Sequence, residues 1–298
     1  MSRVLLTTPT GNTGRHALAA LLAAGRTVRV LVRDARKLTP DDTKRVEVVE
    51  GDGRDVAALV KALIGVDTAF YCTPQSANPP DLGSYYREFA EPFAAAAKVV
   101  GLRRVVSISG GDDLPEPKGP GGVLRMTENL LDAVIPNARH VRCGYFMENL
   151  LWQVAPLAFQ GAFYLPVART TPLPFVAAAD IGRAAGALLA DDAWTGVRAV
   201  EAYGPQSLSC DAAADRLAEA LSTPVRFEQA DPARWVEEMI GHGLSPAMAT
   251  SLRDMFDAIS EGRDMGGIAK HPLPCPTRLG DWARQTLAPA LAAARSGR

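Results

Sequence analysis

The chain has 298 residues, 47% of them hydrophobic and 22% charged, which is typical of a globular protein and excludes a fibrous or disordered chain. Its 32 Lys and Arg nearly balance its 33 Asp and Glu, and the net charge of -1 disfavours binding to nucleic acid through phosphate neutralisation. No apolar stretch reaches the roughly 18 to 20 residues that a membrane span needs, so we expect a soluble protein.

The N-terminus and the cysteines indicate a cytoplasmic protein without a metal site. Only a few apolar residues precede the turn at 7–14, too few for the hydrophobic region of a signal peptide. The chain has four cysteines and four histidines, and neither set shows the spacing of a zinc site or of a disulfide framework. We therefore expect no metal, no membrane and no nucleic acid.

Short apolar strands alternate with helical segments in the first half of the chain. Strands are predicted over residues 4–6, 27–32, 46–49, 67–72, 104–108 and 139–142. Helices are predicted over residues 16–24, 55–63, 85–100 and 124–134. Because parallel strands need crossover helices, this alternation predicts an α/β protein with a doubly wound parallel sheet, the Rossmann fold.

The second half of the chain is less regular. Prolines interrupt any long element between 156 and 174, before a predicted helix over 180–189 and a strand over 197–203. Further helices are predicted over 211–221, 232–241 and 246–261, and the alanine-rich tail over 287–298 is expected to fray. We interpret 1–149 as a ligand-binding Rossmann domain to which 172–204 returns, and 150–298 as a smaller second region, mainly helical from 205.

The first predicted strand runs into a turn at 7–14 that opens directly into a helix. A helix N-terminus offers free N–H groups and the positive end of the helix dipole to a diphosphate. Gly11 allows the backbone to approach the phosphates, and Gly14 allows the helix to pack close to the strand. The alternative is an ordinary turn that needs glycine only for its shape. The candidate cofactor-binding residues of the turn are Thr8, Thr10, Gly11, Asn12, Thr13 and Gly14.

A basic cluster at the end of the second strand predicts NADP(H) as the cofactor. Arg33 can form a bidentate, charge-assisted pair with the 2′-phosphate that only NADP carries. Arg36 and Lys37 add positive charge at a helix start, where cations are unfavourable unless they bind an anion. Asp34 leaves NAD open as the alternative, because a carboxylate here would accept hydrogen bonds from the ribose hydroxyls.

Three later loops also follow the ends of predicted strands, where an open parallel sheet binds its ligand. The glycine-rich loop over 110–122 is interpreted either as a lid over the nicotinamide or as plain solvent-exposed chain. Asp52 is equally well explained as a turn former. The candidates are Asp52 and Gly53 near the adenine, Thr73, Pro74 and Ser107 near the ribose and nicotinamide, and Gln75 toward the substrate.

Eight short segments together match a family pattern. They are 10–14 (Thr-Gly-Asn-Thr-Gly), 32–37, 51–52, 65–67, 109–110, 127–131, 146–150 and 180–182. This set resembles the atypical short-chain dehydrogenases, and within them the NmrA-like group. That group includes type 2 NAD(P)H:quinone oxidoreductases, triphenylmethane reductase-like enzymes and redox-sensing NADP binders. The resemblance spans roughly residues 3–205 and implies a Rossmann fold that binds NADP(H), in an enzyme or in a sensor.

Two departures from the family pattern affect the site. Where the family's turn begins with glycine, this chain has Thr8 and then Pro9, and a β-branched residue before proline resists positive φ. The first turn is therefore expected to be reshaped. The Tyr-x-x-x-Lys pair of ordinary short-chain dehydrogenases is absent, since only one lysine, Lys118, and no tyrosine lie between the fifth strand and Tyr145. The usual route for protonating an alkoxide is therefore missing.

Ser109 and Tyr145 remain as candidate catalytic residues, both as hydrogen-bond donors near the expected nicotinamide. A site without a strong acid suits hydride transfer to an acceptor that needs little help from a proton donor. For the aromatic residues of this region, ordinary core packing is an equally good interpretation. The candidate substrate contacts, besides Gln75, are Phe146, Asn149, Trp152 and Phe175.

We therefore predict an NADPH-dependent reductase of a small conjugated or aromatic molecule of the quinone, enone or imine type. One alternative is an NADP-sensing protein that signals to a partner through its C-terminal helices. The other is an enzyme that uses the fold for a non-redox cyclisation or dehydration, with Ser109, Tyr145 or His140 acting without loss of hydride. The apolar stripe over 85–100 also leaves a homo-oligomer open, although such a stripe is more often core.

Overall fold

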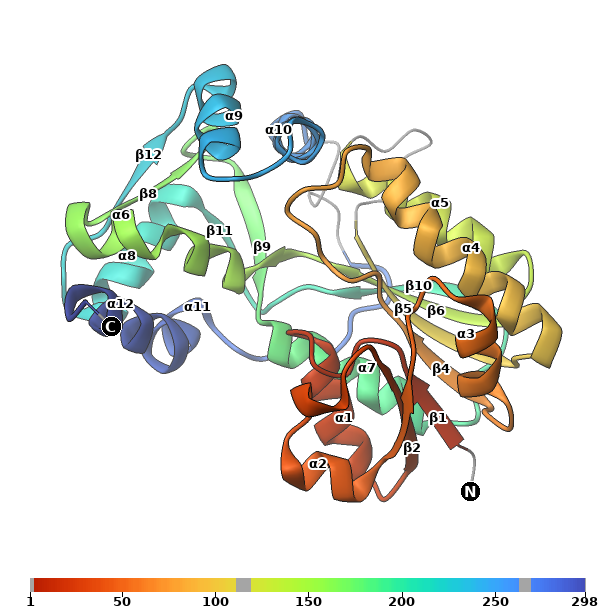
Figure 1. Ribbon diagram of the computed structural model, residues 1–298. Helices are drawn as coiled ribbons and strands as arrows, with labels where there is room; N and C mark the ends of the chain where they lie inside the picture. The colour runs from red at the N-terminus through yellow and green to blue at the C-terminus, as the bar shows by residue number, and fades with distance from the viewer. Residues whose placement is uncertain (1–2, 111–118, 263–268, 298) are drawn as a thin grey trace.

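The computed structural model describes residues 3–110, 119–262 and 269–297. Its centre is a seven-stranded parallel sheet in the order β10-β6-β5-β4-β1-β2-β3 (Figure 1). The strands are β1 (Arg3–Leu6), β2 (Thr27–Val32), β3 (Glu47–Glu50), β4 (Thr68–Tyr71), β5 (Arg104–Gly110), β6 (Asn137–Cys143) and β10 (Val197–Ala202). The order reverses between β1 and β4, which is the Rossmann arrangement, so the predicted fold class is confirmed.

Helices cover both faces of this sheet (Figure 1). α1 (Gly14–Ala23) and α7 (Ala178–Ala190) pack on one face, and α3 (Val56–Leu63), α4 (Leu82–Val100) and α5 (Pro120–Asp132) pack on the other. The short helices η1 (Ala35–Lys37) and α2 (Pro40–Arg45) connect β2 to β3. α7 approaches α1 closely because Gly182 has no side chain, and a Cβ there would lie 2.4 Å from the carbonyl oxygen of Thr13.

Capping residues explain where two of these helices begin and end. The Asp55 carboxylate accepts a hydrogen bond from the amide of Ala57 at 2.8 Å at the start of α3. The Asp81 carboxylate accepts one from the amide of Ser84 at 2.7 Å, so α4 begins three residues before the predicted start. Gly101, with a φ of 68°, ends α4 in the left-handed conformation that glycine adopts without strain.

A second, smaller region forms a lobe beside the sheet (Figure 1). It contains a three-stranded sheet of β11 (Ser207–Ser209), β9 (Pro172–Val176) and β7 (Tyr145–Phe146), and a two-stranded sheet of β12 (Arg226–Gln229) and β8 (Ala162–Leu165). Its helical segments are η2 (Met147–Gln153), α6 (Val154–Gln160), α8 (Cys210–Leu221), α9 (Pro232–Gly241), α10 (Pro246–Ser260), α11 (Leu279–Trp282), η3 (Ala283–Leu287) and α12 (Ala288–Arg295). A separate hydrophobic core holds this region together.

The proline-containing stretch between 156 and 174 contains only short elements, among them β8 and the start of β9. The expectation for the C-terminal tail was wrong. The tail does not fray over its described residues, because α12 buries Leu291 and continues the helical path from Leu287, which is fully buried.

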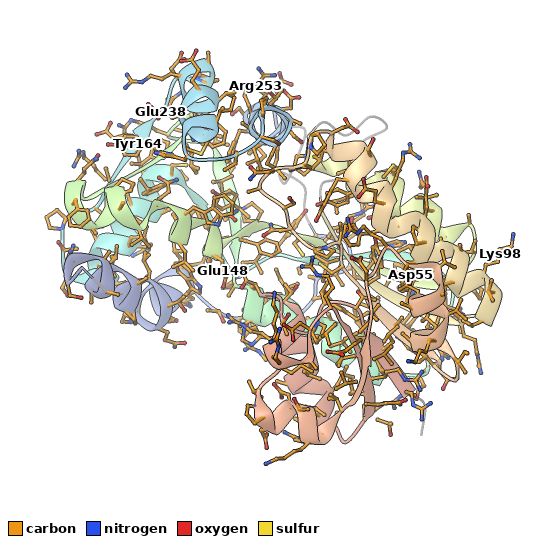
Figure 2. The ribbon with its side chains drawn as sticks, viewed as in Figure 1. Asp55, Lys98, Glu148, Tyr164, Glu238 and Arg253 are labelled. Carbon is orange, nitrogen blue, oxygen red and sulfur yellow. The ribbon has the colours of Figure 1, made fainter. Side chains whose placement is uncertain are left out.

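Glu148 joins the two regions, and Figure 2 places it between them, beside α7. Its Oε2 accepts a hydrogen bond from the amide of Ala178 at 3.0 Å, and its Oε1 accepts one from the indole N–H of Trp282 at 3.1 Å. The fully buried Asp180 adds a second connection, because it accepts a hydrogen bond from the amide of Thr277 at 2.8 Å. The described helices include none that is both long enough and apolar enough to cross a membrane.

Candidate cofactor and active site

The turn at 7–14 connects β1 to α1 in a tight conformation. The amide of Gly11 donates a hydrogen bond to the carbonyl oxygen of Thr8 at 3.2 Å. The amide of Arg15 donates one to the carbonyl oxygen of Gly11 at 3.1 Å. A Cβ on Gly14 would lie 1.8 Å from the Thr8 carbonyl oxygen, so only glycine allows α1 to start at this point. The close packing predicted at Gly14 is therefore a contact with the Thr8 carbonyl group.

The structure accommodates Thr8 and Pro9 without strain. Every residue of the turn is described, and none of them has a positive φ. The turn is thus built without the left-handed residue that a β-branched side chain resists. Gly11 is not required by its φ, and a Cβ there would make only an ordinary contact of 3.5 Å with the Thr8 oxygen. Because Gly11 has no side chain, space remains open on the outer side of the turn.

The turn fits a diphosphate. Thr10, Gly11 and Asn12 are exposed, whereas Thr13 is buried. The amides of Asn12 and Thr13 donate no hydrogen bond within the described part of the chain. Both precede the first turn of α1, where the helix dipole favours a negative charge.

Arg33 follows β2 and is exposed, with no ion pair or hydrogen bond to the residues that the structure describes. The neighbouring Asp34 is fully engaged. Its carboxylate accepts bonds from the amide of Arg36 at 3.0 Å and from the Arg36 guanidinium at 2.9 Å through each oxygen, and these bonds lower the pKa of Asp34. The Arg33 guanidinium lies beside an Asp34 carboxylate whose charge is already balanced by Arg36. This arrangement fits the 2′-phosphate of NADP better than the ribose diol of NAD. Lys37 is exposed nearby.

Asp52 and Gly53 lie at the end of β3, next to a residue that the sequence analysis missed. The Asp52 carboxylate binds the guanidinium of Arg54 through both oxygens, at 2.8 and 3.1 Å, and this bond lowers the pKa of Asp52. The Arg54 guanidinium lies 5.6 Å from the centre of the Phe89 ring, and a Cβ on Gly53 would lie 3.4 Å from the same ring. The charge of Asp52 is therefore engaged within the protein, and Arg54 is a further cation at the adenosine end.

The segment after β4 is anchored at both ends. Thr73 is buried, with its hydroxyl 3.1 Å from that of Tyr71, and the Pro74 carbonyl accepts a bond from Tyr85 at 2.9 Å. Gln75 is exposed. Further along, the Ser245 hydroxyl donates to the carbonyl oxygen of Pro79 at 2.6 Å, which connects this segment to the loop between α9 and α10.

A buried polar cluster lies between β5, β6 and α5. The Ser109 hydroxyl donates to Glu128 Oε1 at 2.6 Å, and Arg142 donates to the same carboxylate at 3.0 Å from Nε and at 2.8 Å from Nη2. All three residues are at most 6% exposed. Burial raises the pKa of Glu128, but the bonds from Arg142 and Ser109 outweigh that effect and hold it below its usual value.

Glu128 and Arg142 were missed by the sequence analysis, although each carries a signal. Glu128 lies between Leu124 and Leu131 on the apolar stripe of α5, which is an unusual place for an unpaired carboxylate. Arg142 alternates with the buried Val141 and Cys143 on β6 and so lies on the other face of the strand, the face toward α5. Their pairing depends on the strand register, which the sequence alone does not provide.

Ser107 and His140 form a second buried chain below this cluster. The Ser107 hydroxyl lies 2.7 Å from His140 Nδ1, and His140 Nε2 lies 2.9 Å from Asp132. The combination resembles a Ser-His-Asp triad, but Ser107 is only 1% exposed, so a substrate has no access to its hydroxyl. His140 is 2% exposed, so the geometry does not favour its role in non-redox chemistry.

Tyr145 lies in the core of the second region rather than on an open surface. It is 4% exposed and burial raises its pKa. Its ring packs against Phe175, its strand partner, at 5.4 Å and against Phe256 at 6.2 Å. The side chain of Asn149 offsets part of this rise in the pKa of Tyr145. The core interpretation of Phe175 and Tyr145 is therefore favoured in this structure.

The other expected substrate contacts differ in exposure. Phe146 and Asn149 are half-buried, whereas Trp152 is 64% exposed on η2. The expected lid falls largely on residues 111–118, which lie outside the described residues. Within the described ranges, no three His, Cys, Asp or Glu side chains are grouped as metal ligands.

The strand order, the phosphate-fitting turn and the free Arg33 define a Rossmann-type dinucleotide-binding protein. A family model described as NAD(P)H-binding matches residues 9–142. The chain is 32% identical over 230 residues to a (4-alkanoyl-5-oxo-2,5-dihydrofuran-3-yl)methyl phosphate reductase of Streptomyces griseus, covering 76% of each chain. It is 26% identical to an NAD(P)H azoreductase of Xenophilus azovorans, covering 85% of this chain and 86% of the relative.

Solved structures agree on the fold. An NADPH-dependent quinone oxidoreductase from Escherichia coli complexed with NADPH superposes with a TM-score of 0.79 at 20% identity, covering 98% of this chain and 99% of the other. A triphenylmethane reductase from Citrobacter sp. gives 0.75 at 17% identity, covering 95% and 99%. The chain therefore belongs to an NAD(P)H-binding family of oxidoreductases, and its cofactor is a nicotinamide dinucleotide, NAD(P)H.

Proposed function

We propose that this protein is an NADPH-dependent reductase that transfers hydride to a small conjugated or aromatic acceptor of the quinone, enone or imine type. The observation that carries the proposal is that, among the residues that the structure describes, none of the expected proton donors is available. The Tyr-x-x-x-Lys pair is absent, the proton of Ser109 is bonded to Glu128, and Tyr145 is buried in the core. An acceptor whose reduction needs little proton donation in the hydride step suits such a site.

The names of the similar proteins support this substrate class. They include an azoreductase, a reductase of an oxo-dihydrofuran phosphate, a quinone oxidoreductase and a triphenylmethane reductase. Each name describes reduction of a conjugated molecule. The substrate contacts that we propose for this chain are Gln75, Phe146, Asn149 and Trp152, whereas Phe175 is packed in the core.

The chain's own residues divide the work of binding between the two ends of the cofactor. The amides of the turn at 10–13 would hold the diphosphate, and Arg33 would bind the 2′-phosphate. Lys37 would add positive charge, Arg36 would keep the charge of Asp34 balanced, and Asp52 and Gly53 would flank the adenine. Thr73, Pro74 and Ser107 are proposed at the ribose and nicotinamide end. When bound, NADPH supplies the hydride.

The experiment that tests the proposal is a turnover assay. The purified protein is mixed with NADPH and a panel of quinones, enones and imines, and the loss of NADPH absorbance is followed. We expect oxidation with at least one conjugated acceptor and none with simple aliphatic ketones, which need a proton donor. NADPH that binds but is not oxidised by any acceptor, at any concentration, would overturn the proposal.

A second candidate function is NADP sensing, in which the protein binds the cofactor and signals to a partner. It is favoured by the hydrogen bonds of Ser245 to the segment after β4, at Pro79 and Ala77, which connect the nicotinamide end to the C-terminal helices. Tight NADPH binding without turnover, together with cofactor-dependent association of a partner, would support this function.

Substitutions of the two turn glycines are expected to separate binding from stability. Gly11→Ala adds a side chain that the protein tolerates but a diphosphate would meet, so NADPH affinity should fall about tenfold while the melting temperature stays unchanged. Gly14→Ala forces Thr8 away from α1 and should also destabilise the fold by about 1–3 kcal/mol. Calorimetric titration with NADPH and thermal unfolding measure the two effects. Wild-type affinity in Gly11→Ala would show that the diphosphate does not bind this turn.

A further inference from the structure

The loop after β3 holds the guanidinium of Arg54 in a fixed plane. Its Nε and Nη2 donate to the two oxygens of the Asp52 carboxylate at 3.1 and 2.8 Å, and the Arg54 amide donates to Asp52 Oδ1 at 2.9 Å. Nη1 lies 3.7 Å from Glu88 Oε2 on α4. The N–H groups of a guanidinium point outward from its edge, so these contacts use its donors and leave its two flat faces for other partners.

Phe89 covers one of these faces. The Arg54 guanidinium lies 5.6 Å from the centre of the Phe89 ring, within the range of a cation–π contact. The Phe89 ring is held in turn by the ring of Tyr85, whose centre is 5.3 Å away, and it packs against the backbone at Gly53, where a Cβ would lie 3.4 Å from it. Phe89 is half-buried, whereas the side chain of Arg54 is 48% exposed. The open part of the guanidinium is therefore the face opposite Phe89.

Arg54 lies where the adenine of the cofactor is expected. The strand order reverses between β1 and β4, so the adenosine half belongs beyond the carboxyl ends of β1 to β3, and Arg54 follows β3 as Arg33 follows β2. The bond from Arg54 is the main cause of the lowered pKa of Asp52, and the charge of Arg33 adds to it. Burial raises the pKa of Tyr85, and the charges of Arg33 and Arg54 oppose that rise. The two arginines thus lie around the same groups, at the same end of the sheet.

The two arginines offer different chemistry to a ligand. Arg33 makes no ion pair or hydrogen bond within the described residues, so its donors are open to a phosphate. Arg54 has its charge and most of its donors engaged by Asp52, so a phosphate would gain less there. What Arg54 offers is an exposed, flat cationic surface, which stacks on the flat face of a nucleobase.

We propose that Arg54 binds the adenine ring of the dinucleotide by stacking, with its guanidinium held between the base and Phe89, and that Phe89 is a positioning residue. The inference rests on the proposed NADPH binding and deepens it. Arg33 recognises the 2′-phosphate, which only NADPH carries, whereas Arg54 recognises the adenine, which NADPH and NADH share.

Arg54→Lys tests the stacking. Lysine keeps the positive charge and can still pair with Asp52, but it has no flat face. The ligands are NADPH, NADH and the hypoxanthine analogue of NADPH, in which a keto oxygen replaces the amino group at the edge of the base and the flat ring remains. We expect the three dissociation constants, measured by calorimetry, to rise by the same factor, about fivefold to tenfold.

Arg87→Lys is the matched control, because Arg87 is an exposed arginine of α4 that pairs with Glu91 at 3.4 Å. It should leave all three dissociation constants unchanged. The positioning role of Phe89 is tested with two variants. Phe89→Leu removes the ring beneath the guanidinium and should weaken all three ligands about threefold, whereas Phe89→Tyr keeps an aromatic face and should bind them as the wild type does. Thermal unfolding shows that each variant has folded.

The outcomes distinguish this inference from the proposed function. If Arg54→Lys weakens NADPH but not NADH, Arg54 binds the 2′-phosphate; if it spares the hypoxanthine analogue, Arg54 binds the edge of the base; if it changes no dissociation constant, Arg54 does not contact the cofactor. Each of these results overturns the inference, while a wild type that binds and oxidises NADPH leaves the reductase proposal standing. A wild type that binds NADPH but oxidises it with no acceptor overturns the reductase proposal alone, and one that binds no dinucleotide overturns both.

Discussion

Replacing Arg33 with Asp is expected to weaken NADPH binding far more than NADH binding. Only NADPH carries the 2′-phosphate, and a charge-assisted guanidinium–phosphate pair contributes about 2 to 3 kcal/mol. The expected loss is therefore roughly 30- to 150-fold for NADPH, with little change for NADH. Arg33 can provide this because it makes no ion pair within the described residues, whereas the neighbouring Asp34 is bound to Arg36. Titration calorimetry with both cofactors measures the difference.

Arg45→Asp is the matched control for this prediction. It makes the same change in net charge on an exposed arginine of α2, which pairs only with Asp41 at 3.6 Å and weakly with a backbone carbonyl. It should affect both cofactors equally and slightly. An equal loss of NADPH and NADH affinity in Arg33→Asp would show that Arg33 supports the local structure rather than the phosphate.

Most of the central sheet could be predicted from the sequence because strands such as β1, β2 and β4 are short, largely apolar runs, and the predicted span 27–32 coincides with β2. The helix boundaries were predicted less accurately, because a capping residue such as Asp81 sets the start of a helix through a single hydrogen bond. The small sheets could not be predicted. Their strands have two to five residues, and each pairs with a segment far away in the chain, as Tyr145 does with Phe175.

The candidate site shows the same division. Residues of the turn and Arg33 could be found because their roles depend on local order along the chain, namely strand, turn and helix. The state of Asp34 depends on the rotamer of Arg36, and that of Ser109 depends on Glu128 from another element. Tyr145 was expected near the substrate on the basis of its position after β6, but its exposure is decided by packing against Phe175 and Phe256. The role of a residue that depends on contacts with another element of the fold thus cannot be predicted from the spacing of residues along the sequence.

Arg142→Ala is expected to cause a large loss of stability, about 3 to 5 kcal/mol, because it leaves Glu128 buried without its guanidinium partner. The loss should depend on pH. In the wild type, Glu128 has a lowered pKa, so its stabilising contribution is present above the pKa of an unfolded glutamate and is lost as the pH falls below it. In the variant, the bonds from Arg142 no longer offset burial, so the pKa of Glu128 rises relative to the wild type, and the stability deficit should shrink as the pH falls.

Urea unfolding near neutral pH and at about pH 5 measures this deficit. Arg125 also faces Glu128, from α5, and His140 lies close by on β6; both are present in the wild type and in the variant. Replacing both partners, with Glu128→Leu and Arg142→Met, should restore most of the stability, since no buried charge is then left unpaired. If the double variant is as unstable as Arg142→Ala, the loss comes from the packing of the arginine side chain, and the charge pair at Ser109 contributes less than its geometry indicates.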